Sequence, residues 1–600
     1  MLFLAATLAL TFPDISRLGS HTPGDYGDAY FNHWLLRWDV HALLTSPLDL
    51  FDANIFWPAR DTLAYSDTLL AVAPLAGVLR VLIGPVLAFN VLYLSTWMLS
   101  LGATYVLAHR LTGDRSASVL AAFIFTFAAV RYQHYVHLQL LFAGLVPLAV
   151  WLLLRFLQER AWWQPAFLGV VFSASILVTA YSALMMGLGL VTMVGAWLVG
   201  ERARPGPRFG TGLLLVIVVT ALLAGPVLWK YRAHRHLLHR DYNEGIAAKP
   251  GDLLAPVIGS YVHGPLDRLA TRHRRDAEHR LFPGLGALVL GAIGALAVRG
   301  REGSDRRRAA RPDDRSVSRR RELMLVLLAS AVLFVLAFGK DQRIAGHRVP
   351  VPFAVLTWMG VPGLDSVRAL GRFMVFPLLG LALLAARGFV RLTGGRPRLS
   401  LAAGVATGAF LLLEYAAPIN VVPRVDTPEF TAVNTVLRYL PPGPVVELPM
   451  ADIRLPTGPY IEPPRMLWSA IDWHPRVNGA SAFFPAGHHE TVMLLNGLGA
   501  DPGVREPALR RLDQLGVAYV VVRLAPVSDD LNVPGVTHYD EARAGQVLTA
   551  LGTRAAEVRR AGLAMLIRLQ DACPDDGRCV APPGSADPES LGPEAVARHG

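Results

Sequence analysis

The sequence predicts a mainly α-helical, polytopic membrane protein, with a transmembrane bundle of about eleven helices and a C-terminal extracytoplasmic domain of α/β or α+β type. Three observations lead to this fold class. Of the 600 residues, 53% are hydrophobic and only 17% are charged, whereas soluble domains carry about 25% charged residues. Apolar stretches that approach the length of a membrane span recur as far as Ala416. Beyond Ala416 the composition becomes polar and rich in proline, so we divide the chain into residues 1–416 and 417–600.

The first apolar stretch, Met1–Phe12, is short for a span and lacks a basic flank. We expect that the start of this helix is missing; the alternative is a signal peptide, although no small-residue cleavage site follows it. Ten further spans are expected after a first external loop at residues 14–85. They cover Val86–Ala108, Ala117–Val130, Leu138–Phe156, Ala166–Thr179, Ser182–Val199, Gly210–Trp229, Leu281–Val298, Leu323–Phe338, Phe373–Phe389 and Leu399–Ala416.

Loop charges predict the orientation of the spans. Lys and Arg total 57 against 46 Asp and Glu, and Arg299–Arg321 alone holds ten Arg and four acidic residues. Such a run can bind nucleic acid, but its place between two spans favours a cytoplasmic loop under the positive-inside rule. We therefore exclude nucleic acid as a partner and expect the N-terminus inside and the C-terminal domain outside. Five Arg-rich connections are then cytoplasmic: His109–Arg115, Arg155–Arg160, Arg202–Arg208, Arg299–Arg321 and Arg391–Arg398.

Because successive spans cross the membrane in opposite directions, the loop charges also predict which segments lie outside. Leu69–Ile83 is short and contains Pro74 and Arg80, so we expect it to lie along the outer face as a juxtamembrane helix. Two external segments, Lys230–Arg280 and Gly339–Arg372, are too polar to cross and are candidates to roof a cavity.

Helical and strand patterns alternate in the C-terminal part, which indicates an α/β or α+β domain. The only cysteines, Cys573 and Cys579, lie in its hydrophilic tail, and both a disulfide and two free thiols remain open. Three helices are expected: one begins at Pro428, a second contains Leu509, Leu512 and Leu515, and a third covers Glu541–Leu551. The expected strands are Val445–Leu448, Val517–Val522 and Leu563–Leu569.

The first external loop carries the strongest functional signal. Asp25 and Asp28 precede a helical pattern in which Trp34 and Trp38 share one face. This pattern predicts a helix in the membrane interface with two carboxylates at its N-terminal end. On residue pattern alone, capping of the helix is the favoured role of both carboxylates.

These motifs resemble the GT-C superfamily of glycosyltransferases, and more closely its bacterial, uncharacterised branch with an external C-terminal domain. The resemblance covers nearly the whole chain, and the acidic first loop is its diagnostic part. It rests on GDYGDAYFNHWLLRWDVHALL at 24–44, FDANIFWP at 51–58, LAYSD at 63–67, HLQ at 137–139, VRALGRF at 367–373, VELP at 446–449 and VNG at 477–479.

The resemblance implies a GT-C-like fold in which an acidic residue of the first external loop, Asp28 or Asp25, is the catalytic base. A base is needed because an acceptor hydroxyl is a poor nucleophile at neutral pH. The leaving group is already a phosphate, so no general acid is required, and direct displacement would invert the anomeric configuration. Some members use a divalent cation; the sequence leaves this open and shows no metal-ligand pattern.

The leaving phosphate needs positive charge. Arg368 and Arg372 lie four residues apart before an expected span, so a helical turn would direct both guanidinium groups at one lipid phosphate. Contact with lipid headgroups is an equally weighted alternative. Arg131, His134 and His137 form a second external cluster that would also bind phosphate, although interfacial packing is the favoured interpretation.

The function implied is transfer of a sugar from a polyprenyl-phosphate donor to an extracytoplasmic glycan, lipid or protein acceptor, at the bacterial cytoplasmic membrane. The alternative is a non-catalytic membrane protein on the same scaffold, either a lipid-linked sugar transporter or a cell-envelope assembly factor. Transporters place ionisable residues near the bilayer midplane, and the expected spans contain few of them.

Overall fold

The structure, a computed structural model, describes residues 1–12, 14–201, 206–234, 247–273, 277–299, 314–339, 341–344, 347–350, 352–360, 364, 367, 369–423, 428–452, 458–524 and 538–570. The chain forms two compact units. The first comprises residues 1–40 and 67–423, and the second comprises residues 41–66 and 424–600.

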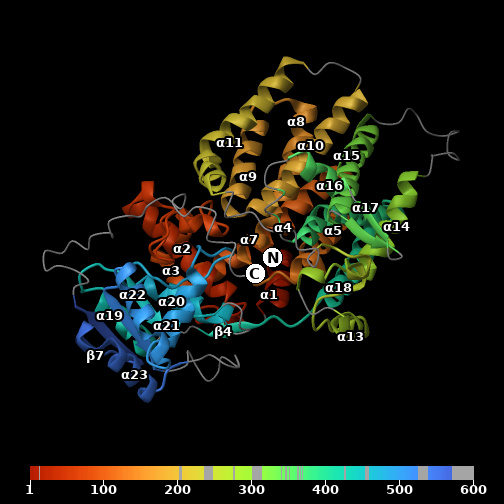
Figure 1. Cartoon of the computed structure of the whole chain (residues 1–600). Coiled ribbons are helices and arrows are strands. Elements are labelled where there is room, and N and C mark those ends of the chain that lie inside the picture. Colours follow the sequence, from red (N-terminus) through yellow and green to blue (C-terminus); the bar gives the residue numbers. More distant parts are fainter. Residues whose placement is uncertain are drawn as a thin grey trace, which may run out of the picture. The chain divides into compact units, whose positions relative to one another are not determined.

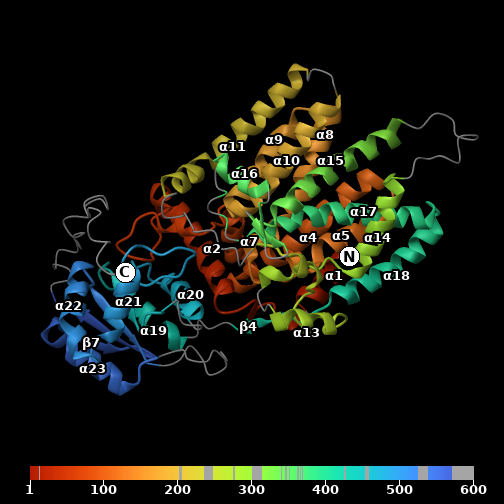
Figure 2. The same cartoon turned by 45° about the vertical axis from the view of Figure 1, so that its right-hand side comes forward.

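The first unit is a bundle of helices (Figures 1 and 2). Its principal helices are α1 (Leu2–Thr11), α2 (Asp28–Thr45, whose last residues belong to the second unit), α3 (Ala73–Ile83), α4 (Pro85–Thr112), α5 (Arg115–Phe127), α6 (Ala129–Tyr132), α7 (Leu138–Leu141), α8 (Leu145–Glu159), α9 (Trp163–Val178), α10 (Ala180–Glu201), α11 (Pro207–Ala233), α13 (Gly264–His273), α14 (Leu285–Arg299), α15 (Asp314–Leu336), α16 (Pro352–Trp358), α17 (Val375–Thr393) and α18 (Pro397–Tyr415).

Short elements complete this unit. They are the 3-10 turns η1 (Ile15–Arg17), η4 (Phe142–Gly144), η6 (Pro250–Leu254), η7 (Ala277–His279) and η8 (Leu370–Met374), and two antiparallel strand pairs, β1 (His21–Pro23) with β4 (Val421–Pro423) and β2 (Asp341–Ile344) with β3 (His347–Pro350). Because β1 precedes α2 and β4 follows α18, the first pair joins the beginning and the end of the unit.

A helix is present at each of the eleven expected spans. Among the residues described, six helical stretches are long and apolar enough to cross a membrane: α4, α7 with α8, α10, α11, η8 with α17, and α18. The multi-pass character is therefore supported, and the count of eleven stays a prediction. The helix α3 has 11 residues, about 16 Å at 1.5 Å per residue, which is too short to cross a hydrocarbon core of about 30 Å.

Among the described residues, helix ends that flank the expected Arg-rich connections contact one another. Arg110, at the end of α4, donates two hydrogen bonds to Glu322 of α15, at 2.9 and 3.0 Å. Ser400 of α18 donates to Asp114, at 2.8 Å. The guanidinium of Arg160, after α8, lies 4.8 Å from the ring centre of Trp197 in α10. This arrangement agrees with alternate crossing, while the side of the membrane on which these connections lie stays a prediction.

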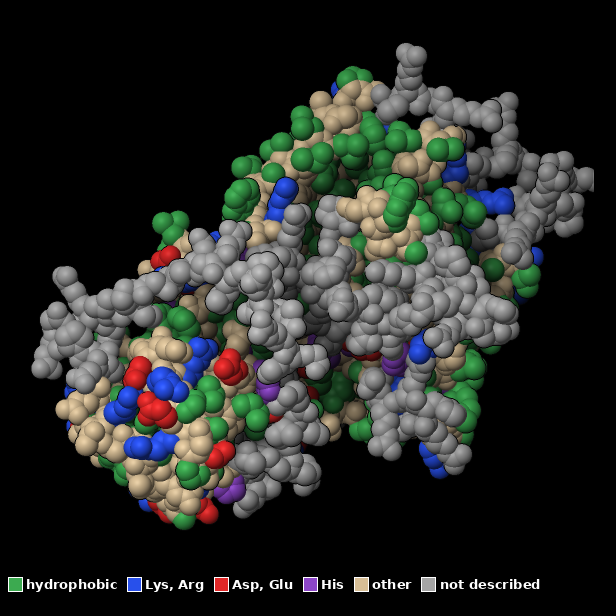
Figure 3. All heavy atoms as spheres, viewed as in Figure 1, with side chains coloured by type: hydrophobic (Ala, Val, Ile, Leu, Met, Phe, Trp, Pro, Cys, Tyr) green, Lys and Arg blue, Asp and Glu red, His purple; other side chains and the backbone are tan. Residues whose placement is uncertain are grey.

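The outward faces of several helices are apolar. In Figure 3, hydrophobic side chains cover the visible surface of α11 and its neighbours. Leu214, Ile217, Leu222 and Trp229 of α11 are all more than half exposed. Lipid contact removes such surface from water, so this face supports membrane insertion.

The second unit contains a four-stranded mixed sheet in the order β5-β6-β8-β7, in which β5 and β6 are parallel and the other pairs antiparallel. Val446, Val520 and Ile567 from three strands are fully buried in its core. The elements are η2 (Pro47–Asp49), η3 (Thr62–Tyr65), α19 (Pro428–Leu437), β5 (Val445–Leu448), α20 (Gly458–Ser469), α21 (His488–Gly497), η9 (Pro502–Val504), α22 (Arg505–Gln514), β6 (Tyr519–Arg523), α23 (Glu541–Leu551), η11 (Gly552–Arg554), β7 (Ala555–Arg560) and β8 (Ala564–Leu569).

Part of the first external loop folds within this second unit, although the sequence analysis assigned residues 14–85 as a whole to the membrane domain. The indole N–H of Trp57 donates to the carbonyl of Leu515 (2.8 Å), and the amide of Asn54 donates to Ser469 (3.0 Å). The interfacial interpretation of α2 also needs correction. Trp34 and Trp38 are 1% and 6% exposed, so they pack inside the protein and do not face headgroups.

Candidate active site

Asp25 and Asp28 lie at the beginning of α2 but have different environments. The backbone N–H groups of Gly27 and Asp28 both donate to Asp25 Oδ1, at 2.9 Å. Asp25 therefore has the capping role that its position allowed. Burial, assisted by the negative charge of Asp28, raises the pKa of the Asp25 carboxyl. Asp28, with a side chain 46% exposed, keeps its carboxylate accessible.

The carboxylate of Asp28 faces His137, which lies just before α7. Asp28 Oδ2 and His137 Nε2 are 3.4 Å apart. The His137 ring in turn lies 5.5 Å from the ring of His134, edge to face. The structure thus brings together Asp28 and His137, two residues that were expected in separate clusters, about 110 positions apart in the sequence.

A buried ion pair continues this series of polar groups. Arg372 Nε donates to both carboxylate oxygens of Glu278, at 3.0 and 3.1 Å, and Arg372 Nη2 also donates to Glu278. His134 Nε2 lies 3.7 Å from the same carboxylate. Burial lowers the pKa of His134 to about 3, so this ring is neutral at pH 7. Burial also opposes ionisation of Glu278, but the positive charge of Arg372 outweighs it and holds the pKa of Glu278 well below the usual range.

Asp67 approaches this series from the end of the first loop. Its carboxylate accepts a hydrogen bond from the N–H of Ala180 (3.2 Å), at the start of α10. Burial raises the pKa of Asp67, and the charges of Arg372 and His137 oppose that rise. The neighbouring Tyr181 ring lies 4.7 Å from the Arg372 guanidinium. Asp67 therefore links the first loop to the same polar cluster.

Arg131 is the least compensated cation near the cluster. Its side chain is 3% exposed and donates from Nη2 to the carbonyl of Leu141 (2.9 Å), while Nε and Nη1 have no hydrogen-bond partner among the described residues. The guanidinium lies 4.9 Å from the ring centre of Phe125. Burial lowers the Arg131 pKa to about 9, so the group still carries its charge at pH 7.

A pocket of about 420 Å³ connects these cations with apolar surface. Two guanidinium groups and one imidazole in an otherwise mostly apolar cavity suit a ligand with an anionic head and a hydrocarbon part. The lining residues are Val130, Arg131, His134, Leu140, Ala143, Tyr181, Ser182, Met185, Arg372, Phe373 and Val375.

The residues selected from the sequence have different outcomes in the structure. Asp28 and His137 are in contact, and Arg131 and Arg372 line one pocket. Arg368 lies outside the described residues, as do Cys573 and Cys579. Glu278 was not selected, because a carboxylate that pairs across about 94 residues, as Glu278 does with Arg372, leaves no local pattern. Asp67 was noted as the last residue of the LAYSD motif but was given no role in the site. Within the described ranges, no group of three His, Cys, Asp or Glu side chains is placed to hold a metal.

Residues 14–412 match the family model described as a domain of unknown function, DUF6311. No curated protein matches the chain. Among solved structures, the arabinofuranosyltransferase AftD from Mycobacteria is similar, with a TM-score of 0.57 and 16% sequence identity. The match covers 95% of this chain but only 39% of the AftD chain. At this identity the likeness establishes a shared fold, which agrees with the predicted GT-C-like architecture.

Two further structures align less well. An oligosaccharyltransferase from Archaeoglobus fulgidus matches with a TM-score of 0.44 and 11% identity, over 87% of this chain and 69% of that chain. ArnT from Cupriavidus metallidurans, bound to undecaprenyl phosphate, matches with a TM-score of 0.39 and 13% identity, over 94% of this chain and 97% of that chain. Both scores are too low to carry an argument about this protein.

Proposed function

Because this chain belongs to the DUF6311 family and shares the fold of a membrane arabinofuranosyltransferase, we propose that it is a membrane glycosyltransferase that transfers a sugar from a polyprenyl-phosphate donor to an extracytoplasmic acceptor. One observation carries the proposal: the accessible carboxylate of Asp28 contacts His137. From His137, further contacts lead through His134 and Glu278 to the guanidinium of Arg372.

Asp28 acts as the general base. The acceptor oxygen attacks the anomeric carbon, the bond from that carbon to the phosphate oxygen breaks, and the hydroxyl proton passes to the Asp28 carboxylate. The electron pair of the broken bond remains on the departing polyprenyl phosphate. A single displacement inverts the anomeric configuration. Asp25 supports the base by fixing the first turn of α2 through the N–H of Asp28 itself.

Arg131 and Arg372 receive the donor phosphate in different ways. Arg372 already bonds to Glu278, so its guanidinium is held in position and partly neutralised. Arg131 retains donors at Nε and Nη1 without partners in the described part of the chain, and its guanidinium supplies the positive charge that the departing phosphate needs. The donor's lipid part lies against the apolar lining contributed by Leu140, Met185 and Val375.

The proposed orientation places the candidate site around Asp28 and His137 on the outer side of the bacterial cytoplasmic membrane. Support comes from the connection 109–115, whose Arg110 and Asp114 contact the described ends of α15 and α18, because cytoplasmic loops of membrane proteins carry an excess of Lys and Arg. Donor and acceptor then meet outside the cytoplasm. Residues 417–600 remain proposed as an extracytoplasmic domain.

The test uses the purified full-length chain in liposomes that contain lipid-linked sugars extracted from bacterial membranes. Release of free polyprenyl phosphate with transfer of the sugar to a second molecule supports the proposal. We expect Arg131→Gln to reduce donor turnover at least tenfold, whereas Arg17→Gln, which removes an exposed charge from the first loop, leaves it unchanged. Movement of intact donor across the bilayer without release of polyprenyl phosphate would instead identify the protein as a transporter.

A further inference from the structure

The segment between α11 and α14 carries an exposed apolar surface. Its described part comprises residues 247–273 and 277–282 and includes η6, α13 and η7. Leu254 of η6 is 62% exposed and Leu269 of α13 is 57% exposed, and these two elements are in contact. Tyr261 and Val262, between them, are 72% and 46% exposed. Apolar side chains that gather on one surface at such exposure indicate a partner other than water.

Hydrogen bonds hold this segment at the ends of expected spans. The backbone N–H of Tyr261 donates to the carbonyl of Ala416 (3.3 Å), the residue that follows α18. The backbone N–H of Ile258 donates to Gln133 Oε1 (2.9 Å), just after α6. Because α18 is long and apolar enough to cross a membrane, Tyr261 lies at the level where a span leaves the hydrocarbon core.

The opposite side of the segment is fixed inside the protein. His263 Nε2 lies 3.0 Å from Glu414 Oε1 of α18, and the two side chains are 7% and 0% exposed. The guanidinium of Arg280, which is itself fully buried, donates to Asp267 of α13 at 2.7 Å. Turning the exposed apolar side chains inward would break these contacts, so the apolar surface is a fixed feature of the fold.

The neighbouring surface of α18 indicates what covers the segment. Val405 and Leu413 of α18 are 67% and 65% exposed, and on a membrane-spanning helix such side chains contact acyl chains. Leu413 closely precedes Ala416, to which Tyr261 is bonded, so the apolar surface of the segment continues the lipid-facing surface of α18. Tyrosine is enriched at this depth, where its ring meets hydrocarbon and its hydroxyl meets water.

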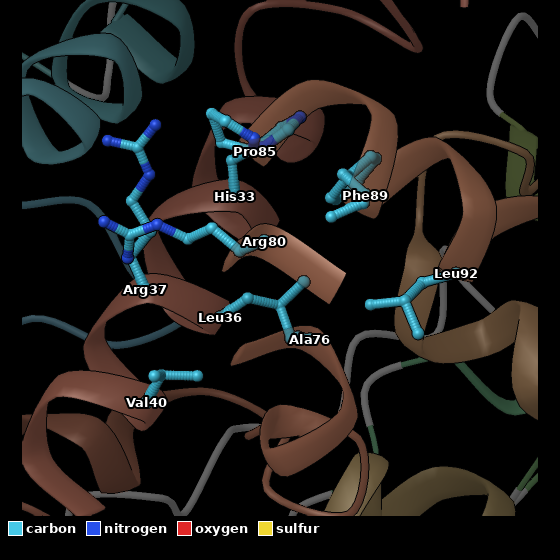
Figure 4. A pocket seen from close by; sticks show the side chains of 10 residues that line it. His33, Leu36, Arg37, Val40, Ala76, Arg80, Pro85, Phe89 and Leu92 are labelled. Atoms are coloured by element: carbon cyan, nitrogen blue, oxygen red, sulfur yellow. The ribbon is translucent and has the colours of Figure 1, made fainter. Parts of the chain in front are cut away.

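The helix α3 has the same character at the same end of the bundle. Ala76 and Arg80 line a pocket together with Leu36 of α2, so this side of α3 faces the protein (Figure 4). Asn90, near the start of the following helix α4, donates to the carbonyl of His21 in β1, which pairs with β4 beyond α18. The exposed side of α3 carries the apolar residues Leu75, Val78, Val81 and Leu82.

We propose that residues 254–269 dock in the interface of the lipid bilayer and form a second membrane anchor in addition to α3. The Tyr261 ring lies among the headgroups, and the exposed aliphatic side chains lie beside the upper part of the acyl chains. Arg268, exposed next to Leu269 on α13, extends towards the lipid phosphates. The anchor steadies the segment that ends in η7 and carries Glu278, and it does not depend on sugar transfer.

The experiment measures the depth of the segment in a bilayer. In the full chain, Cys573→Ser/Cys579→Ser removes the native thiols, and Val262→Cys or Leu269→Cys then carries a small environment-sensitive fluorophore. The labelled chains are reconstituted in phosphatidylcholine liposomes that contain a lipid with a nitroxide either near the headgroup or at the end of an acyl chain. An interfacial position, about 5–10 Å into the headgroup and acyl boundary, predicts quenching about twofold stronger by the shallow nitroxide than by the deep one.

Two control labels calibrate the measurement. Leu222→Cys, at a position 72% exposed near the middle of α11, should be quenched more strongly by the deep nitroxide. Arg510→Cys, at an exposed charged position of α22, should be quenched weakly by both. The labels at Val262 and Leu269 are tested in separate chains, so misfolding of one variant leaves the other decisive.

Two outcomes would overturn the inference. If the labels at Val262 and Leu269 are quenched as weakly as the label at Arg510 and emit as in water, the surface is solvated. If they are quenched weakly but emit as in an apolar environment, protein covers the surface in place of lipid.

Discussion

The ion pair between Arg372 and Glu278 offers a quantitative test of the candidate site. Both side chains are 13% exposed, and the guanidinium nitrogen Nε bonds to both carboxylate oxygens. Removing one partner of such a pair leaves an uncompensated buried charge, which costs about 3–5 kcal/mol. We therefore expect Glu278→Gln and Arg372→Gln each to reduce the free energy of unfolding by about that amount.

A double-mutant cycle isolates the interaction itself. The double variant Glu278→Gln/Arg372→Gln should cost at least about 2 kcal/mol less than the sum of the single variants, because it leaves no unpaired charge. The assay is reversible denaturant unfolding of the full chain in detergent micelles. The pair Arg510–Glu506, 3.8 Å apart with side chains more than 60% exposed, is the matched control, and its disruption should cost under about 1 kcal/mol. If the double variant lost as much stability as the two single variants together, the two side chains would not stabilise each other, and the buried ion pair would be refuted as a source of stability.

Two further variants test other parts of the structure. Asp39 is fully buried, and within the described ranges the Leu69 N–H (3.2 Å) is its only hydrogen-bond donor; burial raises the pKa of Asp39 to about 8. The folded chain thus keeps a proton that the unfolded chain loses near pH 4, so stability falls as pH rises from about 4 to 8. Asp39→Asn should therefore raise the melting temperature more at pH 8 than at pH 5. In the free energy of unfolding, the gain at pH 8 should exceed the gain at pH 5 by up to about 4 kcal/mol; equal gains at both pH values would contradict this. A Cβ at Gly388 of α17 would lie 2.0 Å from the Leu290 carbonyl of α14, whereas one at Gly102 meets nothing within 4 Å. Gly388→Ala should therefore lower stability by about 1–3 kcal/mol in thermal unfolding, with Gly102→Ala as the neutral control.

Local sequence signals predicted many elements of the fold. The helix Glu541–Leu551 has its expected bounds because Asp540 caps it and Gly552 follows it. The expected spans are helical because long apolar segments must satisfy their backbone hydrogen bonds internally in a membrane. The two strands β7 and β8 show the limit of this reasoning. β8 is mostly buried and was expected, whereas β7 is largely exposed and carries no hydrophobic pattern.

The candidate site was predicted only in part, because its partners are distant in sequence. Asp28 and His137 were selected separately, and their 3.4 Å contact follows from the packing of the bundle. Glu278 was missed because a single carboxylate in a polar segment resembles a solvated surface residue. The folding of Trp57 and Asn54 with the second unit was also invisible, since it depends on hydrogen bonds to residues more than 400 positions away.

The role of Asp28 as base is the central claim, and single-turnover sugar transfer by Asp28→Asn tests it most directly. The substitution keeps the size of the side chain and removes the group that takes the proton, so the rate at saturating donor should fall by about 10²–10⁴ while donor affinity stays near that of the wild type. Asp25→Asn retains an oxygen that can accept the N–H of Asp28, so it should lose far less. Transfer by Asp28→Asn at the wild-type rate would contradict the account.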